Sequence, residues 1–330
     1  HRGYVKRTAS SEYRVQARGG KGVRGMETRT KDDSEQDFVQ HLFTAQAHDY
    51  LMFFTNSGRV YVERVYELPE ASRASRGRSI KNVLNLQPEE SIAAVLRLAY
   101  VTDDEGNDVT FSNDSGFILF ATRSGKIKKT AVVDFRNYRK DGIIAIKLDE
   151  GNELIDVRLT SGSDDVVLIT KSGLSLRFNE EQARSQGRAT SGVFGIRPRG
   201  EDCVIGLALV SDEQKLLVAS ENGIGKRTSF DDYRQQSRGG KGVITMKCTE
   251  KTGQVVIQVR DVQGASGGNG QDDNPFNWDE VCKNIESGLI QDGYKRGIDY
   301  EIMLVPNIVN ISYGRGVGYV FEEETFDDSI

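Results

Sequence analysis

Leu51-Met-Phe-Phe-Thr-Asn-Ser57-Gly58-Arg-Val-Tyr-Val62 is the stretch that decides the fold of this chain. An apolar run rich in aromatic residues leads into Ser57-Gly58, and a second apolar run follows. Such runs favour strands, and Ser-Gly or Asn-Gly tolerates the positive φ of a tight hairpin turn. The stretch therefore predicts a β-hairpin that turns at Gly58.

The same unit recurs along the first 255 residues. Its further copies are Phe117–Ile127 with a turn at Gly125, Val166–Leu176 with a turn at Gly173, and Leu216–Ile224 with a turn at Gly223. A second glycine follows each turn, after a basic stretch, in the pairs Gly3/Gly22, Gly58/Gly77, Gly125/Gly142, Gly173/Gly192 and Gly223/Gly242. Four of these five spacings are 19 residues and one is 17, so the chain is built from repeats.

Repeats of about 50 residues predict radial repetition, because a unit of this size cannot bury a core alone and its neighbours must cover it. We expect each repeat to form a small antiparallel sheet. The predicted fold class is mainly all-β, a propeller-like set of four-stranded blades. The expected blades span about 38–87, 88–148, 149–198 and 199–248, with partial blades at about 1–37 and 249–255.

Composition describes an ordinary globular chain that turns often. Its 330 residues suit one to three domains, and 35 Gly against 5 Pro indicate turns made with glycine. No apolar stretch approaches the roughly 18 residues of a membrane span, so we expect no membrane partner and a cytoplasmic location. The start, His1-Arg2-Gly3-Tyr4, has neither an initiator Met nor a signal-peptide core, which predicts a truncated chain. The cysteines Cys203, Cys248 and Cys282 are widely spaced, which favours neither a disulfide framework nor a zinc site.

The net charge of −5 hides an asymmetry along the chain. From Val256 onward there are five basic and fourteen acidic residues, out of 44 and 49 in all. The part before Val256 therefore holds 39 basic and 35 acidic residues and is slightly positive, which suits a polyanion partner.

The heptapeptide Gln16-Ala17-Arg18-Gly19-Gly20-Lys21-Gly22 resembles the box Q-R-R-G-G-K-G of the DNA gyrase A subunit family, and only Ala17 departs from it. Further segments that resemble blades of that family's C-terminal domain are Val60–Arg78, Gly125–Thr130, Gly223–Thr228 and Lys241–Ile244. The resemblance covers residues 1 to about 255. It implies a six-bladed β-pinwheel that wraps double-stranded DNA around a basic rim.

The resemblance also implies partners and a role. In the family this wrapping gives strand passage its handedness, so that the gyrase complex introduces negative supercoils at the bacterial nucleoid. The implied protein partners are the gyrase B subunit together with the rest of the gyrase A subunit. ATP and Mg²⁺ are used elsewhere in that complex. We therefore expect no catalytic residue, metal or cofactor in this chain.

Residue chemistry supports a DNA-binding rim independently. Arg18 and Lys21 flank two glycines whose backbone N–H groups can approach a phosphate. One such loop could be a solvated turn, but basic residues recur at the same place in later repeats. The box candidates are Gln16, Arg18, Gly19, Gly20, Lys21 and Gly22. The rim candidates are Arg24, Arg73, Arg76, Arg78, Lys128, Lys129, Arg139, Lys140, Arg188, Lys226, Arg227, Arg238 and Lys241.

Such a cationic track would contact the DNA backbone and show little sequence preference, since few base-reading side chains accompany it. Gln236–Gly242 is a second near copy of the box, with Ser237 at an arginine position. Because the functional box of the family belongs to its first blade, we interpret this copy as an echo of the repeat.

The character of the sequence changes after Val256. Gly264–Gly270 predicts a Gly-rich loop, residues 275–287 a capped amphipathic helix, and Ile302–Pro306 a buried strand. Val305–Tyr319 resembles the later part of nucleotidyltransferases of the nicotinamide-mononucleotide adenylyltransferase type. The H-x-G-H and I-S-x-T-x-x-R segments with which that family holds phosphates are absent, so we expect 256–330 to be an α/β fragment without activity. Both parts of the chain are incomplete where they meet, which favours an artificial or accidental join of two sequences. A natural fusion and a mobile-element insertion are the alternatives.

Three other functions stay open. The C-terminal domain of the topoisomerase IV A subunit has similar blades but a degenerate or absent box, so Gln16–Gly22 favours gyrase. A protein-binding propeller scaffold explains the repeat but not the box. A nucleotidyltransferase explains only the tail.

Overall fold

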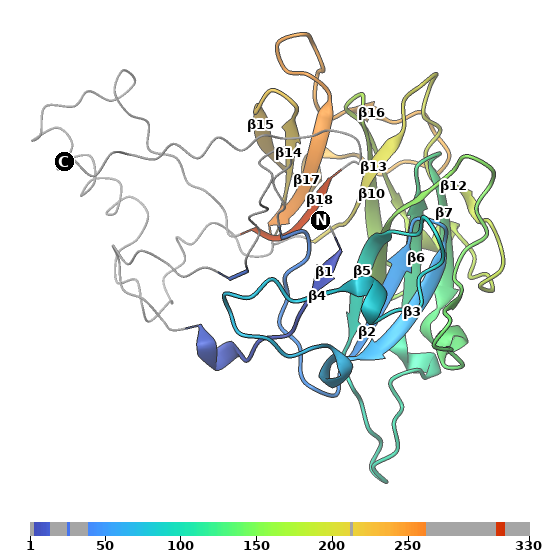
Figure 1. The fold of residues 1–330 in the computed structure, drawn as a ribbon. Coiled ribbons are helices and arrows are strands. Elements are labelled where there is room, and N and C mark those ends of the chain that lie inside the picture. Colours follow the sequence, from blue (N-terminus) through green and yellow to red (C-terminus); the bar gives the residue numbers. More distant parts are fainter. Residues whose placement is uncertain (1–2, 14–24, 27–38, 212–213, 262–307, 314–330) are drawn as a thin grey trace, which may run out of the picture.

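A computed structural model describes residues 3–13, 25–26, 39–211, 214–261 and 308–313 (Figure 1). The strands are β1 (Tyr4–Val5), β2 (Tyr50–Thr55), β3 (Arg59–Arg64), β4 (Arg78–Ser79), β5 (Ile92–Leu98), β6 (Phe117–Thr122), β7 (Lys126–Ala131), β8 (Ile143–Ile144), β9 (Leu154–Thr160), β10 (Asp165–Thr170), β11 (Leu174–Asn179), β12 (Val193–Phe194), β13 (Val204–Leu209), β14 (Lys215–Ser220), β15 (Gly225–Ser229), β16 (Val243–Ile244), β17 (Val255–Asp261) and β18 (Ile308–Tyr313).

The helical elements within these ranges are short 3-10 turns, and none of them is an α-helix. They are η1 (Ser10–Glu12), η2 (Val65–Glu67), η3 (Ile80–Asn82), η4 (Asn113–Ser115), η5 (Val132–Phe135), η6 (Glu180–Gln182) and η7 (Phe230–Asp232). Across the described ranges no helix is long and apolar enough to cross a membrane.

The four predicted hairpins are confirmed. β2–β3, β6–β7, β10–β11 and β14–β15 pair antiparallel and turn at Gly58, Gly125, Gly173 and Gly223, whose φ values are 83°, 86°, 82° and 75°. The threonine before the turn helps to close it: Thr55 Oγ1 accepts a hydrogen bond from the Arg59 N–H at 3.2 Å. Thr122 and Thr170 do the same for the N–H groups of Lys126 and Leu174. The glycines predicted from the sequence therefore make the four turns, and in three hairpins a threonine adds a contact that helps to close them.

The sheets, in contrast, combine strands from two repeats. The strand orders are β5-β2-β3-β8, β9-β6-β7-β12, β13-β10-β11-β16 and β18-β17-β14-β15, and a further two-stranded sheet pairs β1 with β4. β8, β12 and β16 each follow the second glycine of a repeat but pair with the hairpin of the preceding repeat. The expectation that each repeat forms its own sheet is therefore wrong.

This exchange of a short strand between neighbouring repeats has a physical cause. The second strand of each hairpin has an outer edge whose backbone groups need hydrogen-bond partners. Gly142, with φ 69°, turns the chain so that Ile143 and Ile144 reach the edge of β3. The carbonyl oxygen of Gly58 then accepts hydrogen bonds from the N–H groups of Ala145 at 2.9 Å and Ile146 at 3.0 Å. Each exchange thus links two successive repeats through backbone hydrogen bonds.

The last four-stranded sheet reaches into the segment that the sequence assigns to the α/β fragment. β17 continues to Asp261 and pairs with β18 along Ile257–Asp261. The predicted helix over 275–287 and the predicted strand Ile302–Pro306 lie outside the described residues.

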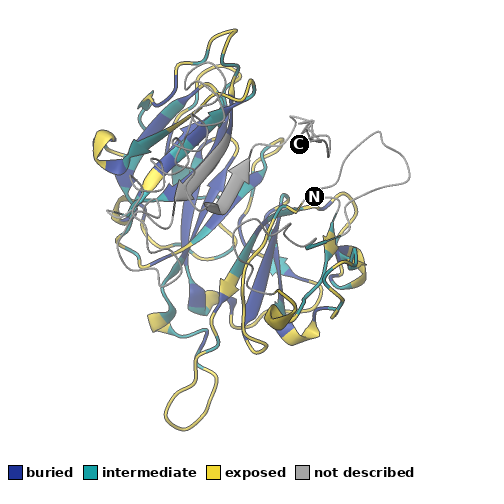
Figure 2. Cartoon of the chain, turned by 90° about the vertical axis from the view of Figure 1, so that its left-hand side faces the viewer, coloured by how far each residue is buried: buried dark blue, intermediate teal, exposed yellow. Residues whose placement is uncertain are grey.

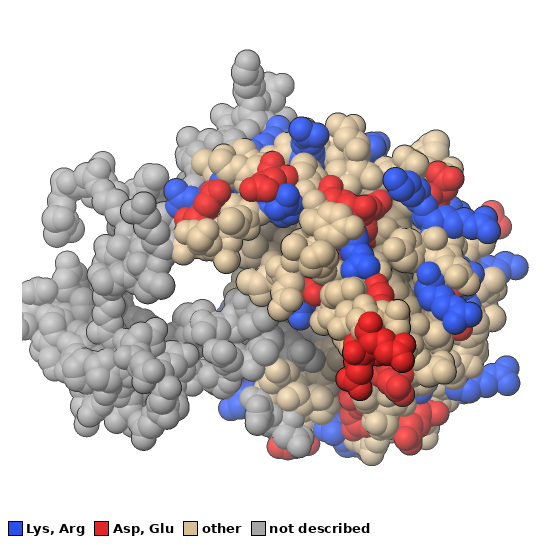
Figure 3. Space-filling view, turned by 90° about the horizontal axis from the view of Figure 1, so that it is seen from below, with Lys and Arg blue, Asp and Glu red and all other residues tan. Residues whose placement is uncertain are grey.

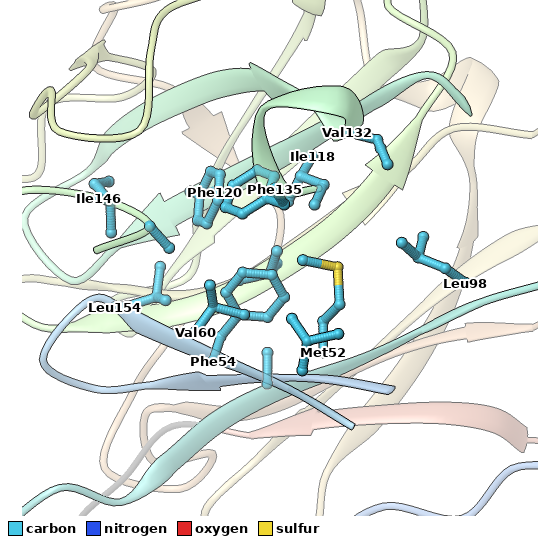
Figure 4. Packing of buried hydrophobic residues seen from close by; sticks show 14 of the residues in the cluster. Met52, Phe54, Val60, Leu98, Ile118, Phe120, Val132, Phe135, Ile146 and Leu154 are labelled. Atoms are coloured by element: carbon cyan, nitrogen blue, oxygen red, sulfur yellow. The ribbon is translucent and has the colours of Figure 1, made fainter. Parts of the chain in front are cut away.

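Successive sheets follow one another around an arc, and the sheets built on β2, β6 and β10 bury both faces (Figures 1 and 2). In β6, Ile118 and Phe120 point into the cluster shared with β2, β3 and β5, while Leu119 and Ala121 point into the cluster shared with β10, β11 and β13. Figure 4 shows the first of these clusters, where the Phe54 and Phe120 rings meet edge to face with centroids 5.5 Å apart. Burial on both faces explains why these strands are apolar at consecutive rather than alternate positions.

Candidate nucleic-acid interface

Four described loops lead into the exchanged strands, and we call them rim loops: 71–77, 136–142, 186–192 and 236–242. In three of them the first N–H group donates to the preceding repeat, from Ala71 to Arg7 O at 3.1 Å, from Gln186 to Lys129 O at 2.8 Å and from Gln236 to Arg177 O at 2.8 Å. These three loops therefore occupy the same place on their respective sheets. The 136–142 loop belongs to the repeat with the shorter 17-residue spacing, and its Arg136 N–H donates instead to Val133 O at 3.2 Å.

The box candidates Gln16, Arg18, Gly19, Gly20, Lys21 and Gly22, together with Arg24, lie outside the described residues. Their roles stay predictions.

An arginine stands four residues before the second glycine in three rim loops, as Arg73, Arg188 and Arg238, and each is partly exposed. Arg188 Nη1 donates to Ile144 O at 3.3 Å, and Arg238 Nε donates to Gln182 O at 2.8 Å. Each of these contacts reaches a different repeat from the one that carries the arginine. A guanidinium has five N–H donors, so such anchoring leaves donors for a phosphate.

Other rim candidates also reach the surface. Arg78, Arg139, Lys140, Lys226 and Lys241 are exposed, while Arg76 and Arg227 are partly exposed. The Arg76 guanidinium lies 4.0 Å from the centroid of the Tyr4 ring. Figure 3 shows Lys and Arg side chains along one margin of the molecule, with a group of acidic side chains nearer the centre of the view. Lys140 and Arg78 come together in one hollow, which Glu63 and Glu67 also line.

Lys128 and Lys129 are not on the surface, and the prediction that they extend the exposed track is wrong. Only 1% of Lys128 and 6% of Lys129 is accessible to solvent. β7, which carries both, is an inner strand of its sheet, and the segment before β12 lies across it, where Ser185 forms a bridge with Lys129. A loop from the next repeat therefore covers both side chains.

The two buried ammonium groups bond to backbone carbonyl oxygens. Lys128 Nζ donates to Ala145 O, to Gly187 O at 3.3 Å and to Arg188 O at 2.7 Å. Lys129 Nζ donates to Gly162 O at 2.9 Å and to Glu180 O at 3.2 Å. Burial, and to a smaller extent the nearby Arg188 charge, lowers the pKa of Lys128 to about 7.

The sequence contained a signal for this arrangement. Lys128 and Lys129 stand three and four residues after a hairpin glycine, where the first repeat has Lys6 and Arg7. Those two side chains also bond to loop carbonyls, Lys6 Nζ to Ser72 O at 2.9 Å and Arg7 Nε to Leu68 O at 3.0 Å. Neither residue was among the candidates, and the repeat register could have indicated both.

The thiols of Cys203 and Cys248 are free. No cluster of three or more His, Cys, Asp or Glu side chains suited to a metal ion occurs in the part of the chain that the structure describes.

Strand-exchanged antiparallel sheets arranged in series, with basic loops at the same place on successive sheets, define a β-pinwheel with a basic rim. A family model described as the DNA gyrase C-terminal domain, beta-propeller, matches residues 1–45, 49–99, 116–161, 164–211 and 214–257. The chain belongs to this DNA gyrase C-terminal domain family, so the predicted family and fold are confirmed.

Known proteins agree with this assignment. The chain is 43% identical over 256 residues to the DNA gyrase A subunit of Mycolicibacterium smegmatis, covering 77% of this chain and 28% of that protein. It is 43% identical over 263 residues to the DNA gyrase A subunit of Salmonella typhimurium, covering 79% and 28%. The chain thus spans about 28% of the length of these relatives.

Solved structures share the fold. The structure of a DNA gyrase A C-terminal domain superposes with a TM-score of 0.60 at 25% identity, covering 95% of this chain and 97% of that one. The C-terminal domain of a DNA topoisomerase IV superposes with a TM-score of 0.59 at 20% identity, covering 94% and 90%, and this likeness concerns the fold alone.

Proposed function

We propose that this chain binds double-stranded DNA along its rim loops and wraps it chirally as the C-terminal part of the DNA gyrase A subunit. Its protein partners are the gyrase B subunit together with the rest of the gyrase A subunit. They form a cytoplasmic complex that uses ATP to introduce negative supercoils. The chain itself performs no catalysis and needs no cofactor.

The observation that carries the proposal is the recurrence of Arg73, Arg188 and Arg238 at one place in three of the four rim loops. The sheets follow an arc (Figure 1), so we expect loops at equivalent places on them to follow a curved line. Bending DNA along such a line is costly, since the persistence length of the duplex is about 150 base pairs, and closely spaced cations offset that cost. Contacts to phosphates alone would give little sequence preference.

Binding is tested by fluorescence anisotropy with labelled duplexes of different sequence over a range of salt concentrations. We expect similar affinities for all sequences and a steep loss of affinity with salt, about 0.9 in log–log slope for each phosphate neutralised. Wrapping is tested by ligating nicked circular DNA in the presence of the chain and resolving the topoisomers. Salt-independent binding, or an unshifted topoisomer distribution, would count against the proposal.

The C-terminal domain of topoisomerase IV is the second candidate, because it shares the fold. The heptapeptide Gln16–Gly22 favours gyrase instead. The ligation experiment separates the two, because binding without a chiral topoisomer shift would support the topoisomerase IV type.

A further inference from the structure

In the first four of the five repeats, the third residue after the hairpin glycine lies beneath the rim loop of the next repeat. The five residues at this position are Lys6, Tyr61, Lys128, Leu176 and Lys226. A Cβ added at Gly142 would lie 2.8 Å from the Tyr61 ring, and one at Gly240 would lie 3.0 Å from Leu176 Cδ1. In these two repeats the rim loop therefore rests on an apolar or aromatic side chain.

Lys6 and Lys128 support their rim loops differently, through the ammonium group. Lys6 Nζ donates to the carbonyl oxygens of Ser72 and Ser75, both at 2.9 Å, and to that of Arg73. Counted back from the second glycine, Ser72 and Arg73 hold the same loop places as Gly187 and Arg188, which bond to Lys128. Two lysines, more than a hundred residues apart, thus make the same pair of contacts.

In both repeats the lysine ammonium bonds to the backbone carbonyl oxygen of the rim-loop arginine. Carbonyl oxygens satisfy the charge of a buried ammonium, which would be costly to bury without partners. The carbonyl group of Arg188 is held from below by Lys128, while its Nη1 donates to Ile144 O at 3.3 Å. The backbone that carries the guanidinium is therefore fixed by a side chain from the preceding repeat.

We propose that Lys6 and Lys128 are positioning residues for DNA binding, whose ammonium groups hold the backbone of Arg73 and Arg188 where each guanidinium can meet a phosphate. The inference rests on the proposed function. It assigns the two lysines an indirect role, because a side chain buried under the loop does not itself touch DNA.

Lys226 offers a matched comparison. It stands at the same position in the fifth repeat, but its side chain is exposed, and among the described residues no rim loop covers it. Replacing Lys226 removes the same type of side chain as replacing Lys128 without removing a contact to the 186–192 loop.

The experiment uses the full chain and its single variants Lys128→Met, Arg188→Ala and Lys226→Met. It also uses the double variants that combine each lysine substitution with Arg188→Ala. Amide hydrogen exchange of 186–192 is measured without DNA, and affinity for a short duplex is measured by anisotropy. We expect Lys128→Met to speed exchange of the loop about tenfold and to weaken binding roughly threefold to tenfold. In the Arg188→Ala background its effect on binding should vanish, because Lys128 acts through Arg188.

Lys226→Met should leave exchange of 186–192 unchanged, and its loss of affinity should add to that of Arg188→Ala. Unchanged loop exchange in Lys128→Met, or additive losses with Arg188→Ala, would overturn the inference while leaving the proposed function intact. Failure of the unmodified chain to bind DNA would instead overturn the proposed function, and the inference with it.

If circular dichroism shows that Lys128→Met does not fold, Lys6→Met with Arg73→Ala repeats the experiment on the 71–77 loop. The same coupling is expected there, and additive losses would overturn the inference.

Discussion

The carbonyl oxygen of Gly125 accepts a hydrogen bond from the N–H group of Ile196 at 3.2 Å, although the two residues belong to different repeats. The N–H of Gly195 reaches the same oxygen at 2.9 Å. The pairs Gly58 with Ile146 and Gly173 with Met246 repeat the contact at 3.0 and 3.1 Å. In these three hairpins the glycine that makes the turn is thus also the point at which the next repeat attaches.

Gly125→Ala should destabilise the fold more than an ordinary turn substitution. Its φ of 86° disfavours an L side chain, and an added Cβ would lie 2.3 Å from Ile196 O. We expect a loss of about 2–4 kcal/mol in the free energy of unfolding, measured by urea denaturation. Gly223→Ala is the control, because Gly223 has a φ of 75° but no neighbour within 4 Å of the added Cβ. That variant should lose only about 1–2 kcal/mol. Equal losses in the two variants would contradict the role of Gly125 as the point at which the next repeat attaches.

Replacing Arg18 and Lys21 together with Ala should weaken DNA binding only modestly, because many other rim cations remain. The same change should abolish most chiral wrapping, because the DNA loses one anchor of its curved path. The topoisomer shift after ligation measures wrapping, with a complete gyrase A C-terminal domain as the reference. Wrapping that survives the double substitution would show that the role given to Gln16–Gly22 is wrong.

Arg188→Ala should reduce the salt dependence of binding. If Arg188 neutralises one phosphate, the log–log slope of affinity against salt falls by about 0.9. Arg123→Ala is the matched control, because Arg123 is equally charged but lies at a hairpin turn, with Nη1 3.9 Å from Glu153 Oε2. Its slope should equal that of the unmodified chain, and equal changes in the two variants would argue against a localised rim.

Lys128 should make stability depend on pH above neutrality. Burial and the Arg188 charge lower the pKa of Lys128 to about 7, from 10.5 in the unfolded chain. Between these values the unfolded chain holds a proton that the folded chain lacks, so stability rises with pH. This contribution is complete above the unfolded pKa and is lost as the pH falls to about 7. Its slope is at most about 1.4 kcal/mol per pH unit.

Urea denaturation at a series of pH values checks this dependence. Lys128→Met should flatten the slope in that window, while Lys226→Met should keep it. If Lys128→Met leaves the slope unchanged, a group other than Lys128 causes the pH dependence of stability.

The segment 256–330 should transfer no nucleotide, because the phosphate-holding segments of the family that it resembles are missing. Incubating the full chain with ATP and nicotinamide mononucleotide, and assaying pyrophosphate, tests this expectation. Release of pyrophosphate above the level of a heat-denatured sample would overturn it.

The sequence by itself determined the hairpins, the repeat and the family. Ser57-Gly58 and its copies specify tight turns through local chemistry, and consecutive apolar residues such as those of β6 require a neighbouring sheet on each face. Such signals are local, so they can be read along the chain without knowing which segments meet.

Only the tertiary structure decided which sheet each short strand joins and which cations reach solvent. A two-residue strand such as Ile143–Ile144 is too short to carry a sequence pattern that indicates its partner. Its pairing depends on the open edge of β3 in another repeat. Lys128 looks in sequence like the exposed Lys226, yet it is buried because the carbonyl oxygens of Gly187 and Arg188, about 60 residues further along the chain, accept its hydrogen bonds. The burial of a charge depends on partners brought by the fold, and sequence position alone does not supply them.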